Sequence, residues 1–348
     1  MSNPIFIARQ DTLENDILPA QWLSHYKLFG EESYTFQDKE IWKKLCMSSA
    51  AANDRDMHAE ALEEMLTTFS AEHTGKWMLT VYGMDAAVLE GLASMAAVAG
   101  NGTAMAAVAA NALLMHAITN SETAMRAIAN SQTAMHAIAN SETAIAVSAV
   151  AMNAIGGNSI ARDAISASSY YDANIKENDM AIAKLVVGFA NLESARYSGC
   201  AGMAADSTAM TAVAASSTAM TAVAASSTAM TAVAASATAM GKIAAVDAAL
   251  SKLAASTTAM DALYARKKQM KGGSASKSGK FIILEISQSN AFNTSKYGYA
   301  TLSDGSKPDW SSYLAKYAFF QKYPKYATYM LNDTDSDDYI YYFDIASP

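Results

Sequence analysis

The chain has 348 residues, of which 51% are hydrophobic and 17% are charged, and its formal net charge is −8. Much of the hydrophobic share is alanine, which buries little area per residue, so the composition argues against one large globular core and favours a repeat architecture. The negative charge and the shortage of Lys/Arg clusters disfavour nucleic-acid binding, because neutralising phosphates requires a basic face.

The first segment, residues 1–90, has a composition of its own. It holds three of the four tryptophans and an acidic stretch, residues 57–66, whose apolar positions follow a helical period. We therefore expect a compact, mainly helical head. The N-terminus shows no basic region followed by an apolar stretch and a cleavage site, so we expect synthesis in the cytoplasm without a signal peptide.

A ten-residue repeat, S-x-T-A-M-x-A-V/I-A-x, fills two arrays, residues 91–155 and residues 206–271. Ala and Met favour helix within each decad, and the Met lies three residues before a Val or Ile on the same helical face. One decad cannot bury this stripe alone, so the stripe must pack on a neighbouring repeat or on another chain. We assign the following members to the core of an oligomer: Met125, Met135, Met210, Met220, Val223, Met230 and Met260.

The period of ten leaves two arrangements open. Ten residues turn through roughly 1000°, about 80° short of three full turns, so the stripe drifts around a straight helix and requires an overwound bundle, for which we expect a homotrimer. In the alternative, each decad is a short helix that ends in a turn. The first array favours such breaks, because Asn130-Ser131 suits a left-handed terminating residue followed by a cap. The second array has Ala225-Ser226 there, and it favours long associated helices because alanine tolerates the left-handed region poorly.

The rest of the chain divides around the arrays. Residues 156–205 keep a helical pattern and predict a helical spacer, and residues 272–279 are rich in Gly and Ser and predict a flexible linker. Residues 280–348 predict strands at 281–286 and 339–343 and a helix at 309–321. The expected fold class is thus mainly α, an elongated shaft of decad repeats that ends in a small, separately folded α+β tip domain.

The tip is the expected binding region. It holds ten of the 17 tyrosines, more than a core of that size needs, and tyrosine suits both core packing and stacking on sugars or protein partners. The candidates for receptor contact are Tyr297, Tyr299, Trp310, Tyr323, Tyr326 and Tyr329.

Motifs of catalysis are missing from the sequence. It contains no Walker loop, no dinucleotide-binding fingerprint, no H-E-x-x-H and no nucleophile elbow, so we expect neither enzymatic activity nor a cofactor. His116 and His136 share one repeat position with Arg126, which indicates an exposed, tolerant position and no ligand pair. The two cysteines, Cys46 and Cys200, lack the spacing of a zinc site.

An acidic run is the one metal candidate. Asp333, Asp335 and Asp337 alternate as the ligands of a calcium loop do. Asp338 stands where such a loop requires glycine, and an acidic turn between two strands explains the run as well. The alanine-rich segments are interrupted every few residues by polar side chains, so we expect no membrane span.

The layout as a whole has a known counterpart. A helical head, decads such as NSETAMRAIANSQTAMHAIAN, a Gly/Ser linker and a short aromatic C-terminal module resemble the fibre and receptor-binding proteins of tailed bacteriophages. This resemblance covers the layout and the repeat and carries over no functional residue. It implies a virion protein whose head docks on other virion proteins, whose shaft is a homotrimer and whose tip binds a glycan or protein of the host surface.

Two other functions remain to be compared with this one. In the first, the chain is a virion connector, such as a collar, whisker or head-decoration protein, and its tip binds other virion proteins and no receptor. In the second, it is an enzyme that degrades surface polysaccharide. The enzyme is disfavoured, because glycoside hydrolysis requires paired carboxylates and the tip offers no large β framework to hold them.

Overall fold

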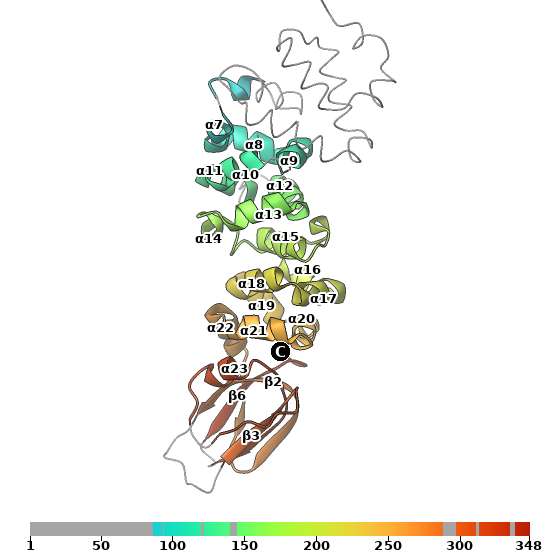
Figure 1. Cartoon of the computed structure of the whole chain (residues 1–348), viewed down its shortest axis with the longest axis vertical. Coiled ribbons are helices and arrows are strands. Elements are labelled where there is room, and N and C mark those ends of the chain that lie inside the picture. The colour runs from blue at the N-terminus through green and yellow to red at the C-terminus, as the bar shows by residue number, and fades with distance from the viewer. Residues whose placement is uncertain are drawn as a thin grey trace, which may run out of the picture. The chain divides into compact units, whose positions relative to one another are not determined.

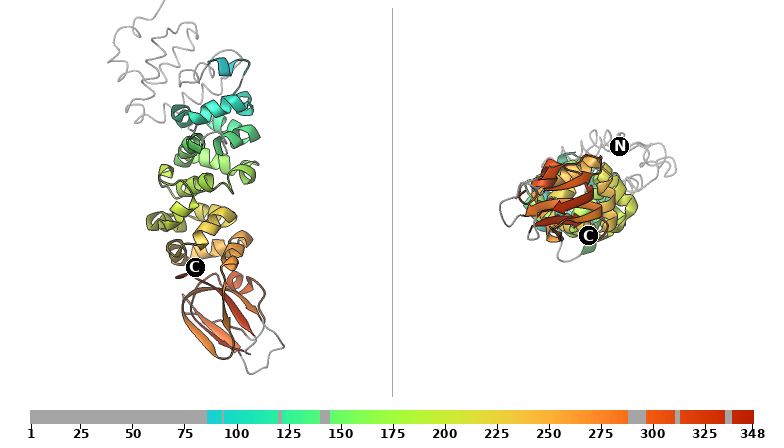
Figure 2. Two further views of the ribbon diagram at one scale, coloured as in Figure 1. Left: turned by 180° about the vertical axis from the view of Figure 1, so that it is seen from behind. Right: turned by 90° about the horizontal axis from the view of Figure 1, so that it is seen from below.

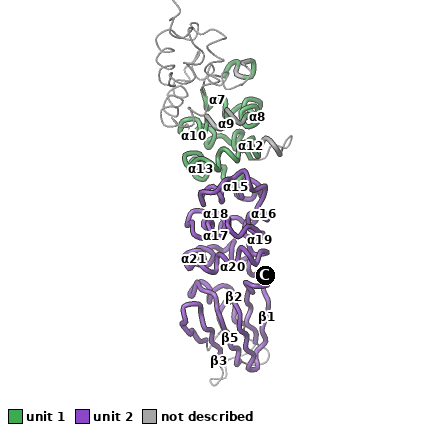
Figure 3. Tube along the Cα trace, turned by 90° about the vertical axis from the view of Figure 1, so that its right-hand side faces the viewer, with its two compact units in different colours: residues 1–175 green, residues 176–348 purple. Residues whose placement is uncertain are grey.

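The computed structural model describes residues 86–92, 94–119, 122–139, 145–287, 297–310, 313–334 and 338–348. The chain divides into two compact units, residues 1–175 and residues 176–348, which are coloured separately in Figure 3. Each unit is described by itself. The predicted helical head lies, up to residue 85, outside the described residues.

Unit 1 contains a succession of short helices. They are η3 (Ala86–Leu89), α7 (Met95–Gly100), α8 (Gly102–Ala110), α9 (Ala112–Thr119), α10 (Glu122–Ala129), α11 (Gln132–Ala139), α12 (Ile145–Gly157), α13 (Ser159–Ser166) and α14 (Tyr171–Asn174).

Unit 2 continues the same pattern and ends in strands (Figure 1). Its helices are α15 (Asp179–Phe189), η4 (Ser194–Arg196), α16 (Cys200–Ala205), α17 (Ser207–Ala215), α18 (Ser217–Ala225), α19 (Ser227–Ala234), α20 (Ala237–Ala244), α21 (Asp247–Ala254) and α22 (Thr257–Ala265). We call α15–α22 the helical stack.

Each decad of the second array is one short helix, so the long helices that we expected there are wrong. The chain turns by 103° between α17 and α18. At this break Ser216 has an extended backbone, with φ −92° and ψ 113°, and its side chain accepts a hydrogen bond from the Ala219 N–H. No decad break among the described residues carries a positive φ. A break between decads therefore needs no left-handed residue. The poor tolerance of alanine for the left-handed region, which argued against a break at Ala225-Ser226, does not apply.

The helices stack in layers of three. In unit 2, α15 packs on α18, α16 on α19 and α17 on α20, and in unit 1 α7 packs on α10 and α8 on α11. Consecutive helices also touch, as α17 and α18 do. Three decads thus form one layer and the next three cover it, which is how a repeat array builds a continuous core from one chain.

The apolar stripe is buried inside this stack. In α17 the inward face is Ala209, Met210, Val213 and Ala214, none of them more than 3% exposed. The residues that we assigned to an oligomer core are likewise no more than 1% exposed in a single chain: Met125, Met135, Met210, Met220, Val223, Met230 and Met260. The assignment to an oligomer core needs correction. Each helix packs its apolar face on the helix three positions later in the same chain, as α17 does on α20, so no second chain is required to bury it. The homotrimer was inferred from an exposed stripe, and this ground for it is gone.

Serines at the breaks join the layers. Ser236 accepts a hydrogen bond from the Ala239 N–H (3.1 Å), and its hydroxyl donates to the carbonyl oxygen of Ala204 (2.6 Å), 32 residues earlier. Ser131 makes the same two bonds in unit 1, with Ala134 N–H and the Ala99 carbonyl. One hydroxyl thereby satisfies an amide at the start of its own helix and a carbonyl at the end of the helix in the layer below.

The spacer predicted at residues 156–205 belongs to these stacks. Its helix α15 is buried from Ala181 to Gly188, and Cys200 is also buried. Burial, followed by the neighbouring Asp179, raises the pKa of the Cys200 thiol. Among the described helices none is long and apolar enough to cross a membrane by itself, and only α17 with α18, bent as they are, meets the length and composition criterion as a pair.

The C-terminal domain is one antiparallel sheet with a short helix. It comprises β1 (Lys268–Lys271), β2 (Ala275–Ser287), β3 (Tyr297–Leu302), β4 (Asp309–Trp310), α23 (Ala318–Lys322), β5 (Ala327–Asp333) and β6 (Tyr339–Asp344), in the spatial order β1-β6-β2-β5-β3-β4. The strands expected at 281–286 and 339–343 are confirmed. The helix expected at 309–321 is reduced to α23, because its first residues form β4.

The flexible linker at residues 272–279 is also wrong. Ala275 pairs with Asn332 and Ser278 with Tyr329, so β2 begins inside the supposed linker. The turn before it is held by hydrogen bonds from the Gly272 N–H to the Asp338 carbonyl and from the Gly273 N–H to the Thr334 carbonyl, each 2.8 Å. Gly273 and Ser274 have positive φ, so the small residues serve a tight turn between β1 and β2.

β2 is central to the domain. Its first half pairs with β5 and its second half with β6, and its register shifts between Ser278 and Phe281. Residues of both halves enter one apolar cluster: Met270, Phe281, Ile283, Ile286, Ala300, Leu302, Trp310, Phe319, Ala327, Met330, Ile340 and Tyr342. Figures 1 and 2 show the domain at the end of the helical stack within unit 2.

Candidate binding surface of the C-terminal domain

The tyrosine candidates separate by strand face. Ala300 of β3 lies opposite Met330 of β5, and both belong to the apolar cluster. Because side chains alternate along a strand, Tyr299 and Tyr329 lie on the other face of the sheet. Both are partly exposed, and their ring centroids are 5.7 Å apart with an interplanar angle of 38°. Two of the six predicted contact residues are thus neighbours on the outer face.

The surroundings of this tyrosine pair combine one leucine with small hydroxyl-bearing residues. Leu331 lies opposite Tyr299 on β5, and Thr301 lies opposite Tyr329 on β3. On the neighbouring β2, Ser276 and Ser278 face Leu331 and Tyr329, and both serines are exposed. We call this region, defined by Tyr299, Tyr329, Leu331, Ser276 and Ser278, the tyrosine face. Its side chains, two aromatic rings beside hydroxyl groups, suit a ligand that offers an apolar surface together with hydroxyl groups.

Trp310 is a core residue, so its assignment to receptor contact is wrong. It is only 3% exposed and packs edge-on against Phe319, with ring centroids 5.7 Å apart. Its strand partner is Gly298, where an added Cβ would lie 2.3 Å from the indole. The glycine leaves the space that the ring fills. The sequence gives no sign of this, because the pairing of β4 with β3 is not local.

The remaining tyrosine candidates do not join the tyrosine face. Tyr323 packs at the edge of the apolar cluster against Phe319, at 5.2 Å between ring centroids. Tyr326 is partly buried, and the ammonium of Lys280 lies 5.5 Å from its ring. Tyr297 begins β3, and its side chain lies outside the described part of the chain.

The described part of the acidic run, Asp333, does not support a calcium site. Asp333 accepts a hydrogen bond from the Ser274 hydroxyl, whereas Asp335 and Asp337 lie outside the described residues. Within the described ranges no group of three or more His, Cys, Asp or Glu side chains is placed to hold a metal. Of the repeat-position residues, Arg126 and His136 are exposed as predicted, and the side chain of His116 is not described.

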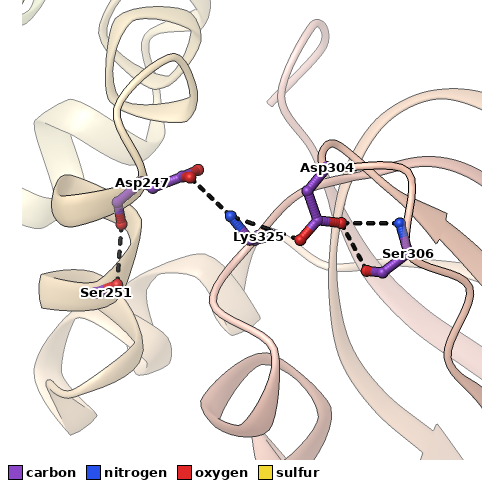
Figure 4. Close-up of polar contacts among 5 residues, drawn as sticks. All are labelled: Asp247, Ser251, Asp304, Ser306 and Lys325. Atoms are coloured by element: carbon purple, nitrogen blue, oxygen red, sulfur yellow. Dashed lines mark hydrogen bonds and ion pairs between the residues drawn. The ribbon is translucent and has the colours of Figure 1, made fainter.

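The domain is fixed to the end of the helical stack by charged pairs. Figure 4 shows Lys325 between two carboxylates: its ammonium lies 2.7 Å from Asp247 of α21 and 3.7 Å from Asp304, in the turn after β3. Asp304 also accepts hydrogen bonds from the Ser306 N–H and hydroxyl. Exposed pairs of this kind each contribute little to stability, but together they set the position of the domain.

Aromatic contacts complete this junction. Tyr264 of α22 packs edge-on against Tyr317, with ring centroids 5.7 Å apart, and donates a hydrogen bond to Glu285 of β2. Burial, and then the hydrogen bond to Glu285, raise the pKa of Tyr264. Asp261 accepts hydrogen bonds from Tyr317 and Lys316, which lower its pKa in that order. Sequence reasoning missed this junction, because it treated residues 272–279 as a linker.

A comparison of the chain with protein-family models and with curated proteins finds no match.

Proposed function

We propose that the chain is a virion fibre protein without enzymatic activity, in which the decad repeats carry the C-terminal domain and this domain binds a receptor on the host surface. The proposal includes contact of the N-terminal region with other virion proteins. Its starting point is the resemblance of the layout to the fibre proteins of tailed bacteriophages.

The observation that supports the receptor role best is the tyrosine face together with the junction behind it. Tyr299 and Tyr329 stay partly exposed although the domain has an apolar cluster in which to bury aromatic rings. Aromatic side chains kept at a surface are typical of recognition sites. The ion pairs of Lys325 and the packing of Tyr264 attach the domain to α21 and α22, so the tyrosine face is held in a set orientation on its support.

Competition for adsorption tests this function. The particles that carry the protein are mixed with host cells in the presence of excess purified chain. We expect the wild-type chain to reduce adsorption by at least about tenfold and the double variant Tyr299→Thr, Tyr329→Thr to reduce it little, because threonine keeps the strand but removes both rings.

The control is a pair of changes on the helical stack. Thr211→Ala with Thr221→Ala alters two exposed residues of α17 and α18 and should compete as well as the wild type. Circular dichroism of each variant verifies that the fold is retained. If the wild-type chain does not compete at all, the receptor role fails and the virion connector becomes the better account.

A further inference from the structure

A second aromatic surface lies on the outer face of β6. Ile340 and Tyr342 belong to the apolar cluster, so the alternating residues Tyr339 and Tyr341 lie on the opposite face of the strand. Both are partly exposed, and their rings stack with centroids 6.2 Å apart and an interplanar angle of 24°. The ring of Tyr264, in the last turn of α22, lies 6.4 Å from that of Tyr341. We call Tyr339, Tyr341 and Tyr264 the aromatic row.

The register of the sheet sets three polar neighbours beside this row. Gln269 of β1 and Glu285 of β2 lie opposite Tyr341, one on each side of β6. Lys271 of β1 lies opposite Tyr339. Residues directly opposite each other on paired strands point to the same face of a sheet, so these side chains and the two tyrosines form one continuous surface. Gln269 and Lys271 are exposed on it.

The cations of this surface lack carboxylate partners. The ammonium of Lys267 lies 4.1 Å from the ring centroid of Tyr264 and 5.8 Å from that of Tyr341. Rings at this distance position an ammonium but do not neutralise its charge. Glu285 is already engaged, since its carboxylate accepts a hydrogen bond from the Tyr264 hydroxyl. Among the described residues neither Lys267 nor Lys271 forms an ion pair, so both charges are available to a partner.

The spacing of the rings favours an extended polypeptide as that partner. Along an extended chain, side chains of one face recur every second residue, at about 6.4–6.8 Å. Tyr341 is the middle ring of the row, 6.2 Å from one neighbour and 6.4 Å from the other. An extended segment laid along β6 can therefore set alternate side chains against successive rings. Lys267, beside Tyr341, and Lys271, beside Tyr339, make an acidic segment the complementary one.

We propose that the aromatic row binds an extended acidic segment of a protein partner, whose aromatic side chains pack on Tyr339 and Tyr341 and whose carboxylates pair with Lys267 and Lys271. The proposal goes beyond the proposed function, because it assigns a protein contact to a surface outside the tyrosine face. Since the row includes Tyr264 of α22, the bound segment touches both the helical stack and the C-terminal domain.

The test uses the full chain and a soluble glutamate–tyrosine copolymer as the probe, with binding measured by calorimetry. The variant Lys267→Gln with Lys271→Gln removes both cations from exposed positions, and we expect binding to weaken by at least about tenfold. The control, Lys242→Gln with Lys252→Gln, removes the same charge from α20 and α21 and should weaken binding by less than about twofold.

Tyrosine variants test the packing on the rings. Tyr339→Thr with Tyr341→Thr keeps strand-forming residues but removes both rings, and we expect at least about tenfold weaker binding of the copolymer. The matched control, Tyr299→Thr with Tyr329→Thr, removes two rings from the tyrosine face and should stay within about twofold of the wild type. Circular dichroism verifies the fold of each variant. If the first tyrosine pair does not fold, the lysine pairs decide.

The inference is overturned if the copolymer does not bind, or if a variant pair and its control weaken binding equally. Tighter binding of polygalacturonate than of the copolymer would also overturn it, because a polysaccharide would then be the better occupant. Adsorption is a separate readout. If the copolymer binds at the aromatic row while the wild-type chain fails to compete for adsorption, the inference stands and the receptor role falls. If the chain competes but the copolymer does not bind, the receptor role stands and the inference falls.

Discussion

The serine at the start of a decad caps its own helix and also bonds the layer below, and the sequence predicts only the first of these functions. As a residue before a helix it is expected to cap that helix. Its second bond, from Ser236 to the Ala204 carbonyl or from Ser131 to the Ala99 carbonyl, reaches a residue 32 positions earlier. Such a bond can form only if three helices complete one layer, so the serine reports on the whole stack as well as on its own helix.

Substitution of Ser236 separates the two functions. Ser236→Ala removes the cap and the bond to the lower layer, and we expect it to lower the free energy of unfolding by about 1–3 kcal/mol. Ser236→Asp keeps the cap acceptor but cannot donate to Ala204, so its loss should be intermediate. Urea denaturation of the full chain measures both values. The control is Ser217→Ala, at an exposed first helical residue. Equal losses at Ser236 and Ser217 would contradict the role of the serine between layers.

At the scale of elements, one carboxylate from outside the helix caps the N-terminus of α19 in unit 2. Glu177 accepts hydrogen bonds from the backbone N–H groups and the hydroxyls of Ser227 and Thr228, at the N-terminus of α19. A negative charge at this end also interacts favourably with the helix dipole. Burial raises the pKa of Glu177, and the hydrogen bonds from Ser227 and Thr228 outweigh it, so the pKa is lowered overall.

A pH-dependent stability follows from that lowered pKa. A carboxyl group whose pKa is lower in the folded state stabilises the fold above its unfolded pKa, about 4.3 for glutamate, and this contribution is lost as the pH falls through the folded value. The stability difference between the wild type and Glu177→Gln should be largest near pH 7 and should shrink below about pH 4. Urea midpoints at several pH values measure it. Glu193→Gln removes an exposed carboxylate of the same unit and serves as the control; an identical pH profile for the two variants would refute the role of Glu177.

The elements differ in how far the sequence predicts them. The decad and its apolar stripe are visible in the sequence, because Met and Val recur at fixed spacing, and strands β2 and β6 follow from their runs of apolar residues. The helix breaks were missed in the second array, because we required a left-handed residue where Ser216 is simply extended. The exposure of Tyr299 follows from strand alternation, whereas the burial of Trp310 depends on pairing with Gly298.

At the scale of the molecule, the structure does not keep two expected divisions: the linker at residues 272–279 and the separation of the tip from the repeats. Residues 272–279 belong to the sheet, so a fragment that begins near residue 279 would lack β1 and the start of β2, and we no longer expect it to fold as a separate tip. The stack and the C-terminal domain form one compact unit, residues 176–348. The contacts between the stack and the C-terminal domain join residues far apart in the sequence, such as Asp247 and Lys325, which are separated by 78 positions. Local sequence patterns do not reveal such contacts.

The central claim is that the decads bury their Met and Val side chains within one chain. A core formed between chains makes thermal stability depend on protein concentration, whereas a core formed within one chain does not. The most direct test is the melting temperature of residues 176–348, followed by circular dichroism over about a hundredfold range of concentration. We predict the same melting temperature throughout. A melting temperature that rises steadily with concentration would contradict the account and return the stripe to an interface between chains.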